Sequence, residues 1–308
     1  MSSSTPSAAL PAQFLALSLA WGSSFLLMSV GVGGLSPLQV AAVRMALGAA
    51  TLGITVVILR MPLPRSGRAW GHISVTAVFL CVIPFSLFAW AGQHISSGLM
   101  SIFNATTPLM TLMVSLVALR AERPHKFQLA GLVLGLAGVL LVLAPWKLTH
   151  DAATTTSAAQ LACLAATVSY GIAFVYLRKF VSPLGLRAPA VAATQVSVGA
   201  VLLLMVVLCF DRQPMSLTPE VVVSMVALGV VGTGFAYIWN TNIVAGWGAA
   251  VASSVTYTTP VIGVALGFVV LGEHISWNQP VGAAIVIVAI LLSRRKVRLP
   301  AQAKVSPR

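Results

Sequence analysis

Apolar runs of about 20 residues alternate with short polar segments along the whole chain. A helix rises 1.5 Å per residue, so a run of that length crosses a hydrocarbon layer about 30 Å thick. The pattern predicts an all-α integral membrane protein with ten transmembrane helices. The predicted spans are Pro11–Val32, Pro37–Leu59, Trp70–Gly92, Ser97–Leu119, Phe127–Pro145, Ser157–Leu177, Arg187–Phe210, Glu220–Val244, Ala249–Leu271 and Gln279–Ser293.

Composition supports a membrane protein and argues against a soluble one. Of the 308 residues, 58% are hydrophobic and 7% are charged, whereas globular proteins carry about a quarter charged residues. The formal net charge of +13 would suggest nucleic acid as a partner of a soluble protein. Here most of the basic residues lie in short loops between apolar runs, so we expect no nucleic-acid binding.

The basic residues gather on one side of the predicted spans. They follow the second, fourth, sixth and tenth spans: Arg60, Arg65, Arg68, Arg120, Arg123, Lys126, Arg178, Lys179, Arg187, Arg294, Arg295, Lys296 and Arg298. The opposite loops hold only Lys147 and Arg212 as bases. The positive-inside rule then predicts a multi-pass protein of the inner (cytoplasmic) membrane with both termini in the cytoplasm.

The two halves of the chain resemble each other at a shift of about 150 residues. The shift aligns Trp21-Gly-Ser-Ser-Phe25 with Tyr170-Gly-Ile-Ala-Phe174, and Thr107-Pro108 with Thr259-Pro260. We therefore predict two five-helix repeats, residues 1–150 and residues 151–308, the second ending in a short basic tail. Because each repeat has an odd number of spans, the second would be inverted in the membrane. Inverted repeats around a central cavity are common in secondary transporters that work by alternating access.

These residues resemble a known family. The residues that carry the resemblance are the Trp21-Gly22 pair, Arg44 in the second span, and Pro108 with Glu122 at the end of the fourth span, together with the corresponding residues of the second half. Through them the chain resembles the EamA-type branch of the drug/metabolite transporter superfamily. The resemblance covers essentially the whole chain. It implies ten helices in two inverted repeats around a cavity, and transport of amino acids, related metabolites or xenobiotics, often outward.

Arg44 is the one charged residue that the pattern places well inside a span. A guanidinium in hydrocarbon is costly, so it needs a reason to be there. Three remain open: a side chain that snorkels to the interface, a structural hydrogen bond to helix ends, or a cavity charge that receives a substrate carboxylate. The corresponding residue of the second half is Gln195.

Polar residues and a proline share one face of the fourth span, and a similar face recurs in the ninth. Pro108 and Pro260 are expected to bend these helices, because proline removes a backbone hydrogen bond. One interpretation is a kinked helix contact. The other is a pair of gating helices, with Asn104 and Thr256 facing the solute path.

Aromatic and amide residues recur at corresponding depths in other spans. Those predicted to line a cavity, besides Arg44, Asn104 and Gln195, are Trp21, Trp90, Tyr170, Trp239, Asn240 and Tyr257. The alternative for aromatic residues near span ends is anchoring at the membrane interface.

The chain lacks the signals of an enzyme or a metalloprotein. Cys81, Cys163 and Cys209 lie in apolar runs without a CxxC pair, and there is no GxSxG or HExxH motif. No Asp or Glu lies inside a predicted span apart from Glu220 at the edge of one. We expect no catalytic residues, no metal and no cofactor.

The sequence predicts an exporter of amino acids or related metabolites, whose partners are a small solute and the lipid bilayer. Two alternatives stay open: a multidrug or organic-cation efflux carrier, and a receptor or scaffold that does not transport. Whether the protein is a monomer or a homodimer also stays open, because Gly263 and Gly267 would permit a close helix contact within one chain or between two.

Overall fold

The structure, a computed structural model, describes residues 9–118, 126–143, 153–247 and 255–293, and within them every regular element is helical. The first half comprises α1 (Ala9–Gly22), α2 (Ser24–Gly31), α3 (Pro37–Ile58), α4 (Gly67–Ala77), η1 (Val78–Val82), α5 (Ile83–Ala91), α6 (Ser97–Asn104), α7 (Thr107–Ala118) and α8 (Lys126–Leu143). The second half comprises α9 (Ala153–Tyr176), η3 (Leu177–Val181), η4 (Ser182–Leu184), α10 (Ala188–Phe210), α11 (Pro219–Val226), η5 (Ala227–Phe235), α12 (Ala236–Trp247), α14 (Val255–Leu271) and α15 (Asn278–Ser293).

Seven helical segments are long and apolar enough to cross a membrane. They are Ala9–Gly31, Pro37–Ile58, Gly67–Ala91, Ser97–Ala118, Thr155–Leu184, Ala188–Phe210 and Pro219–Ile243. The described parts of the fifth, ninth and tenth predicted spans are shorter apolar helices, Leu129–Val142, Thr258–Leu271 and Asn278–Leu292. The all-helical membrane class is confirmed, while the count of ten crossings in two inverted repeats and the division at residue 150 stay predictions.

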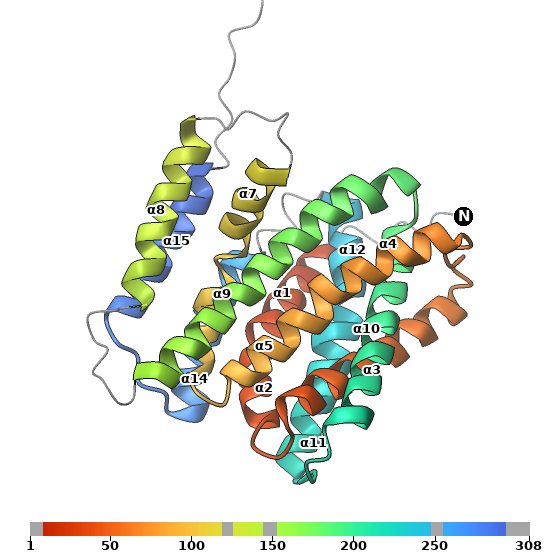
Figure 1. Cartoon of the computed structure of the whole chain (residues 1–308), viewed down its shortest axis with the longest axis horizontal. Coiled ribbons are helices and arrows are strands. Elements are labelled where there is room, and N and C mark those ends of the chain that lie inside the picture. The colour runs from red at the N-terminus through yellow and green to blue at the C-terminus, as the bar shows by residue number, and fades with distance from the viewer. Residues whose placement is uncertain (1–8, 119–125, 144–152, 248–254, 294–308) are drawn as a thin grey trace, which may run out of the picture.

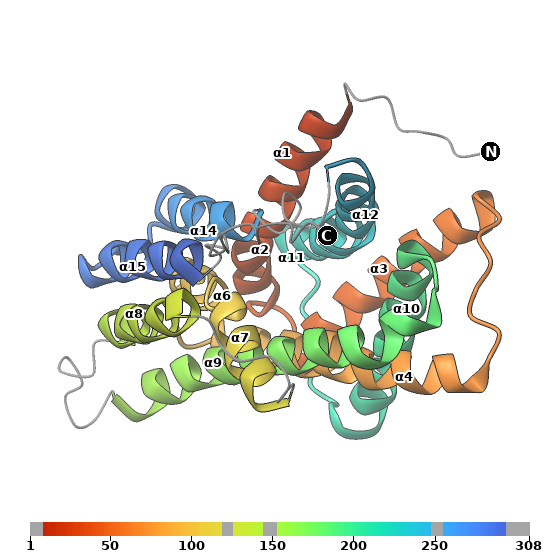
Figure 2. The same ribbon diagram turned by 90° about the horizontal axis from the view of Figure 1, so that it is seen from above.

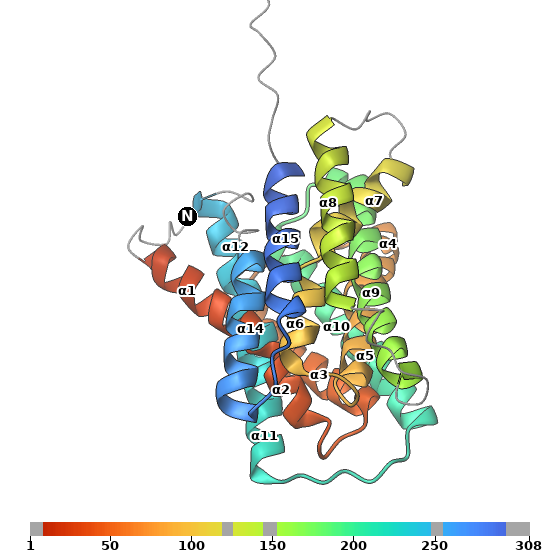
Figure 3. The same ribbon diagram turned by 90° about the vertical axis from the view of Figure 1, so that its left-hand side faces the viewer.

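The helices form two groups joined by a central one. α8 packs along α15 at one edge, and α10 packs against α3 and α4 at the other (Figures 1 and 2). α9 runs between the groups and contacts α5, α6 and α7. Seen from the side, the connection between α10 and α11 lies at the end opposite the start of α8 (Figure 3).

Capping residues fix where several helices begin. Ser36 accepts a hydrogen bond from the Gln39 amide while the Gln39 side chain accepts one from the Ser36 amide, and Pro37 follows at the first turn of α3. At the start of α6 the Glu273 carboxylate accepts the Ser97 and Gly98 amides at 2.7 and 3.0 Å. A residue just after α14 thus ties that helix to α6.

Small residues let helices of the two halves approach closely. A Cβ atom on Gly263 of α14 would lie 2.5 Å from Ser101 of α6, and one on Gly48 of α3 would lie 2.6 Å from Thr233 of η5. Real Cβ atoms do not come this close, so neither glycine accepts a side chain without a shift of its neighbour. These contacts hold α6 against α14 and α3 against η5.

Three spans depart from regular α-helix near the middle of the molecule. η1 and η5 are π-helical, and each continues directly into the α-helix that follows it. The fourth span is interrupted between Asn104 and Thr107, and Pro108 lies in the first turn of α7. Pro260 instead lies inside α14. π-helical turns and helix breaks are frequently found at functional sites.

Candidate functional site

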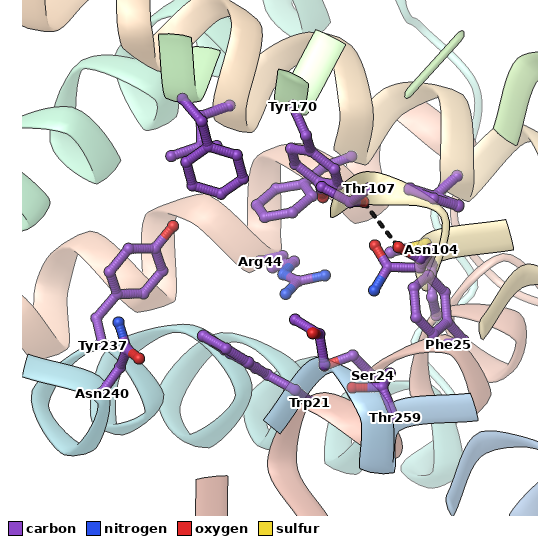
Figure 4. Close-up of a pocket in the computed structure, with 16 residues that line it drawn as sticks. Trp21, Ser24, Phe25, Arg44, Asn104, Thr107, Tyr170, Tyr237, Asn240 and Thr259 are labelled. Atoms are coloured by element: carbon purple, nitrogen blue, oxygen red, sulfur yellow. Dashed lines mark hydrogen bonds between the residues drawn. The ribbon is translucent and has the colours of Figure 1, made fainter. Parts of the chain in front are cut away.

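A cavity of about 220 Å³ is lined by residues in or next to these irregular segments, among them Leu80 of η1, Asn104 and Thr107 at the break, and Tyr237 just after η5 (Figure 4). This volume is below the roughly 300–1,000 Å³ of pockets for drug-sized ligands, which favours a small metabolite over a large drug. Helices from both halves supply the walls: Trp21, Ser24, Phe25, Met28, Arg44, Leu80, Phe85, Phe88, Asn104, Thr107, Tyr170, Phe174, Tyr237, Asn240, Thr256 and Thr259.

Aromatic rings form much of the wall. Phe25 meets Phe88 edge to face with ring centroids 5.1 Å apart, and Phe88 lies 6.3 Å from Tyr170. Trp21 and Tyr237 approach from α1 and α12 (Figure 4). Such a wall offers apolar contact and ring faces to a ligand, with a hydroxyl on each tyrosine.

Arg44 brings a positive charge to this wall. Its side chain is only 6% exposed. Its Nε donates a hydrogen bond to Thr233 Oγ1 at 3.0 Å, and its guanidinium carbon lies 4.0 Å from the centroid of the Phe85 ring. The hydrogen bond from Nε and the contact with the Phe85 ring fix the plane of the guanidinium group. Its two terminal nitrogens have the geometry to donate a pair of hydrogen bonds to a carboxylate.

No carboxylate is among the residues that line this cavity in the described part of the chain. Acidic, histidine and cysteine side chains also form no cluster able to hold a metal ion within the described ranges. The guanidinium therefore faces aromatic rings, hydroxyls and the Asn104 and Asn240 amides. A buried cation without an acidic neighbour favours an anionic ligand group.

Six of the residues predicted from sequence meet at the cavity: Trp21, Arg44, Asn104, Tyr170, Asn240 and Thr256. They come from six different helices, and Figure 4 shows the first five around one space. The two predicted kink residues are each next to a lining threonine in the chain. Pro108 follows Thr107, and Pro260 follows Thr259.

Three other predicted residues lie outside the cavity wall in the described structure. Trp90 contacts His94, with ring centroids 4.8 Å apart, and Trp239 stacks on Phe235 at 6.0 Å. Gln195 is buried, and its Nε2 donates to the Cys81 Sγ at 3.6 Å. The Tyr257 side chain is outside the described residues, as is Glu122.

The structure also brings in residues that the sequence did not single out. Phe85, Tyr237 and Thr233 surround Arg44 or hold it. Tyr237 had one available signal, because it lies three residues before Asn240 and so shares a helix face with it. Phe85 and Thr233 had none, since each contacts Arg44 from a distant part of the chain.

Comparison with known proteins gives a consistent result. The sequence profile of the EamA-like transporter family matches residues 12–144 and again residues 157–295. The uncharacterized transporter YoaV of Bacillus subtilis is 26% identical, with 92% of this chain and 97% of that protein covered. The uncharacterized inner membrane transporter YedA of Escherichia coli K12 is also 26% identical, with 95% and 93% covered.

Structural comparison supports the same fold. A protein of known crystal structure superposes with a TM-score of 0.64 at 21% identity, covering 93% of this chain and 96% of that one.

Proposed function

The chain belongs to the EamA-like transporter family and is a multi-pass membrane transporter of small solutes rather than an enzyme, and we propose that it exports amino acids or related amphipathic monocarboxylates by alternating access. The observation that carries this proposal is Arg44, a buried cation in an aromatic cavity whose described lining has no carboxylate. A substrate carboxylate would pair with the guanidinium, and an apolar or aromatic body would contact the rings.

The break in the fourth span supports movement at this cavity. The polar face of α6 ends at Asn104, and α7 begins at Thr107, so two lining residues flank the break. The Ala105 and Thr106 amides still hydrogen-bond to carbonyls of α6, whereas Pro108 has no amide proton to donate across the break. The angle between α6 and α7 can therefore change at the cost of few backbone hydrogen bonds. Pro108 and Pro260 are the proposed gating positions, one next to each lining threonine.

Organic-cation efflux is the second candidate, because ring faces attract cations. Seven of the lining residues are aromatic, which favours such a ligand. The guanidinium of Arg44 opposes it, since a second cation in the same small cavity would be repelled. The two candidates therefore predict opposite effects of removing Arg44.

The test is uptake into liposomes that contain the purified protein, with labelled amino acids, organic cations and sugars. We expect saturable amino-acid flux in the wild type and a KM raised about tenfold or more in Arg44→Ala, because a hydrogen bond to a charged group contributes about 1.5–3 kcal/mol. Arg44→Lys keeps the charge and loses the planar fork, so its KM should lie between the two.

Two results would contradict the proposal. The first is a wild-type protein that carries organic cations but no amino acids, and an Arg44→Ala variant that still carries the cations. This result would assign the protein to drug efflux. The second is the absence of flux for every solute in the panel, which would remove the transport claim for these substrates. Release of labelled amino acid from preloaded cells, compared with cells that lack the protein, tests the outward direction.

A further inference from the structure

Three hydroxyl side chains in the cavity wall have already used their protons. Ser24 Oγ donates to the Ala20 carbonyl at 2.8 Å, and Thr107 Oγ1 donates to the Asn104 carbonyl at 2.7 Å. Thr259 Oγ1 donates to the Val255 carbonyl at 3.3 Å. A hydroxyl has one proton and two lone pairs. In this arrangement the three groups therefore face a ligand as hydrogen-bond acceptors.

These acceptors line the same cavity although they come from α2, α7 and α14. Figure 4 shows Ser24 beside Thr259 below Arg44, and Thr107 above it, with Asn104 between them in front of the guanidinium. The side-chain carbonyl of Asn104 can add another acceptor. Hydrogen bonds from Ser and Thr side chains to carbonyls of their own helix are common, and they explain each of these three hydroxyl groups taken alone. They do not account for three such groups, from three different helices, around the space in front of one guanidinium.

The ligand group that matches a set of acceptors is a donor with several protons. An ammonium has three N–H donors and no acceptor. The Phe25 ring is labelled next to Asn104 and Ser24 in Figure 4, and a ring face also attracts an ammonium. A plain amine would still be repelled by Arg44, whereas a zwitterion carries its own carboxylate to neutralise that charge.

We propose that Ser24, Thr107 and Thr259 form a binding subsite for the α-ammonium group of the substrate, so that the cavity selects zwitterionic amino acids over monocarboxylates that lack the amino group. This inference rests on the proposed function, in which Arg44 receives the carboxylate. It goes further by assigning the second charged group of the substrate to named acceptors and by predicting a selectivity.

The experiment measures competition against labelled L-phenylalanine in proteoliposomes. The two competitors are unlabelled L-phenylalanine and 3-phenylpropionate, which has the same ring and carboxylate without the amino group. In the wild type we expect phenylalanine to compete at least tenfold better. Thr107→Val and Thr259→Val should each lower that preference several-fold to about tenfold, because each removes one hydrogen bond to a charge.

Two further variants separate recognition from damage to the fold. Thr107→Ser keeps the hydroxyl and should restore the preference. Thr194→Val is the matched control. Among the residues that the structure describes, Thr194 is a buried threonine outside the cavity wall whose hydroxyl has no hydrogen-bond partner. It should leave the preference unchanged.

The outcomes distinguish this inference from the proposed function. If 3-phenylpropionate competes as well as phenylalanine in the wild type, the ammonium subsite is refuted while carboxylate recognition stands. Equal weakening of both competitors in Thr107→Val and Thr259→Val also refutes it. If neither compound competes for or enters the wild type, the subsite fails together with the proposed function.

Discussion

Thr233 is expected to act as a positioning residue for Arg44. Its hydroxyl accepts the Arg44 Nε proton at 3.0 Å and donates to the Leu228 carbonyl at 3.2 Å. The hydroxyl is fully buried. Thr233→Val removes both bonds and keeps the shape of the side chain, including the methyl group that packs against Gly48. The variant therefore leaves Arg44 charged and unanchored at Nε.

The size of the effect follows from the lost bond. A hydrogen bond to a charged group contributes about 1.5–3 kcal/mol, which corresponds to roughly tenfold to 150-fold in an equilibrium constant. Arg44 recovers part of this if it turns toward another acceptor, so the lower limit is the expected value. Substrate binding should weaken about tenfold, because the guanidinium must be reoriented before it can pair with a carboxylate.

The assay is the concentration dependence of amino-acid uptake by proteoliposomes, with melting temperature measured on the same preparations. We expect KM to rise about tenfold in Thr233→Val with a smaller change in maximal rate, and Thr233→Ser to restore KM. Thr194→Val removes a buried hydroxyl that has no partner within the described residues and should change neither quantity. A lower melting temperature with an unchanged KM would refute the positioning role and leave Thr233 as a packing residue.

Three further predictions concern the frame around the site. Glu273→Gln should lower the melting temperature by a few degrees, equivalent to about 1–2 kcal/mol, because it removes the charge that accepts two amides at the start of α6; an unchanged melting temperature would contradict this cap. Gly263→Ala should destabilise the protein by about 1–3 kcal/mol and reduce transport, since the new Cβ would lie 2.5 Å from a side chain of α6. Gly53→Ala, where nothing lies within 4 Å of the new Cβ, is its matched control, and equal behaviour of the two would argue against the close contact. In a background without the native cysteines, Gln213→Cys should react with an impermeant maleimide added outside cells and Arg65→Cys only after permeabilisation; the reverse result would invert the predicted orientation.

The hydropathy pattern predicted most of the helices because the physics behind it is local. A chain in lipid must satisfy its backbone hydrogen bonds within each segment, so an apolar run of sufficient length becomes a helix whatever its neighbours are. The predicted second span and α3 both begin at Pro37, where Ser36 and Gln39 form a cap within four residues of sequence. Seven long spans appear where the pattern placed them.

The residues that line the cavity were only partly predictable, because they depend on which face each helix turns toward the cavity. A π-helical turn inserts extra residues per turn, and so rotates everything that follows it relative to a regular α-helix. η5 precedes α12, and there Tyr237 and Asn240 line the cavity whereas Trp239 stacks on Phe235. Within α12 the sequence prediction included Trp239, although it lies about 100° around the helix from Asn240, and omitted Tyr237, which shares the face of Asn240.

The side chains around Arg44 could not be predicted from the sequence, for a different reason. The sequence identified a charge inside a span and left its role open among three interpretations. Thr233 and Phe85, which hold the guanidinium, lie far from it along the chain and belong to residue types common in any span. Only the packing of α3 against η5 and α5 shows that they meet.

The central claim is that Arg44 recognises a substrate carboxylate in an amino-acid carrier, and exchange across proteoliposomes tests it most directly. L-phenylalanine and its amide, which lacks the carboxylate charge, compete for exchange of labelled L-phenylalanine in the wild type and in Arg44→Gln. This variant gives α3 the side chain that Gln195 has at the corresponding position of the second half. We predict that the wild type prefers the amino acid by at least about tenfold and that the preference nearly disappears in the variant. A preference that persists in Arg44→Gln, or a wild type that does not distinguish the two compounds, would contradict the account.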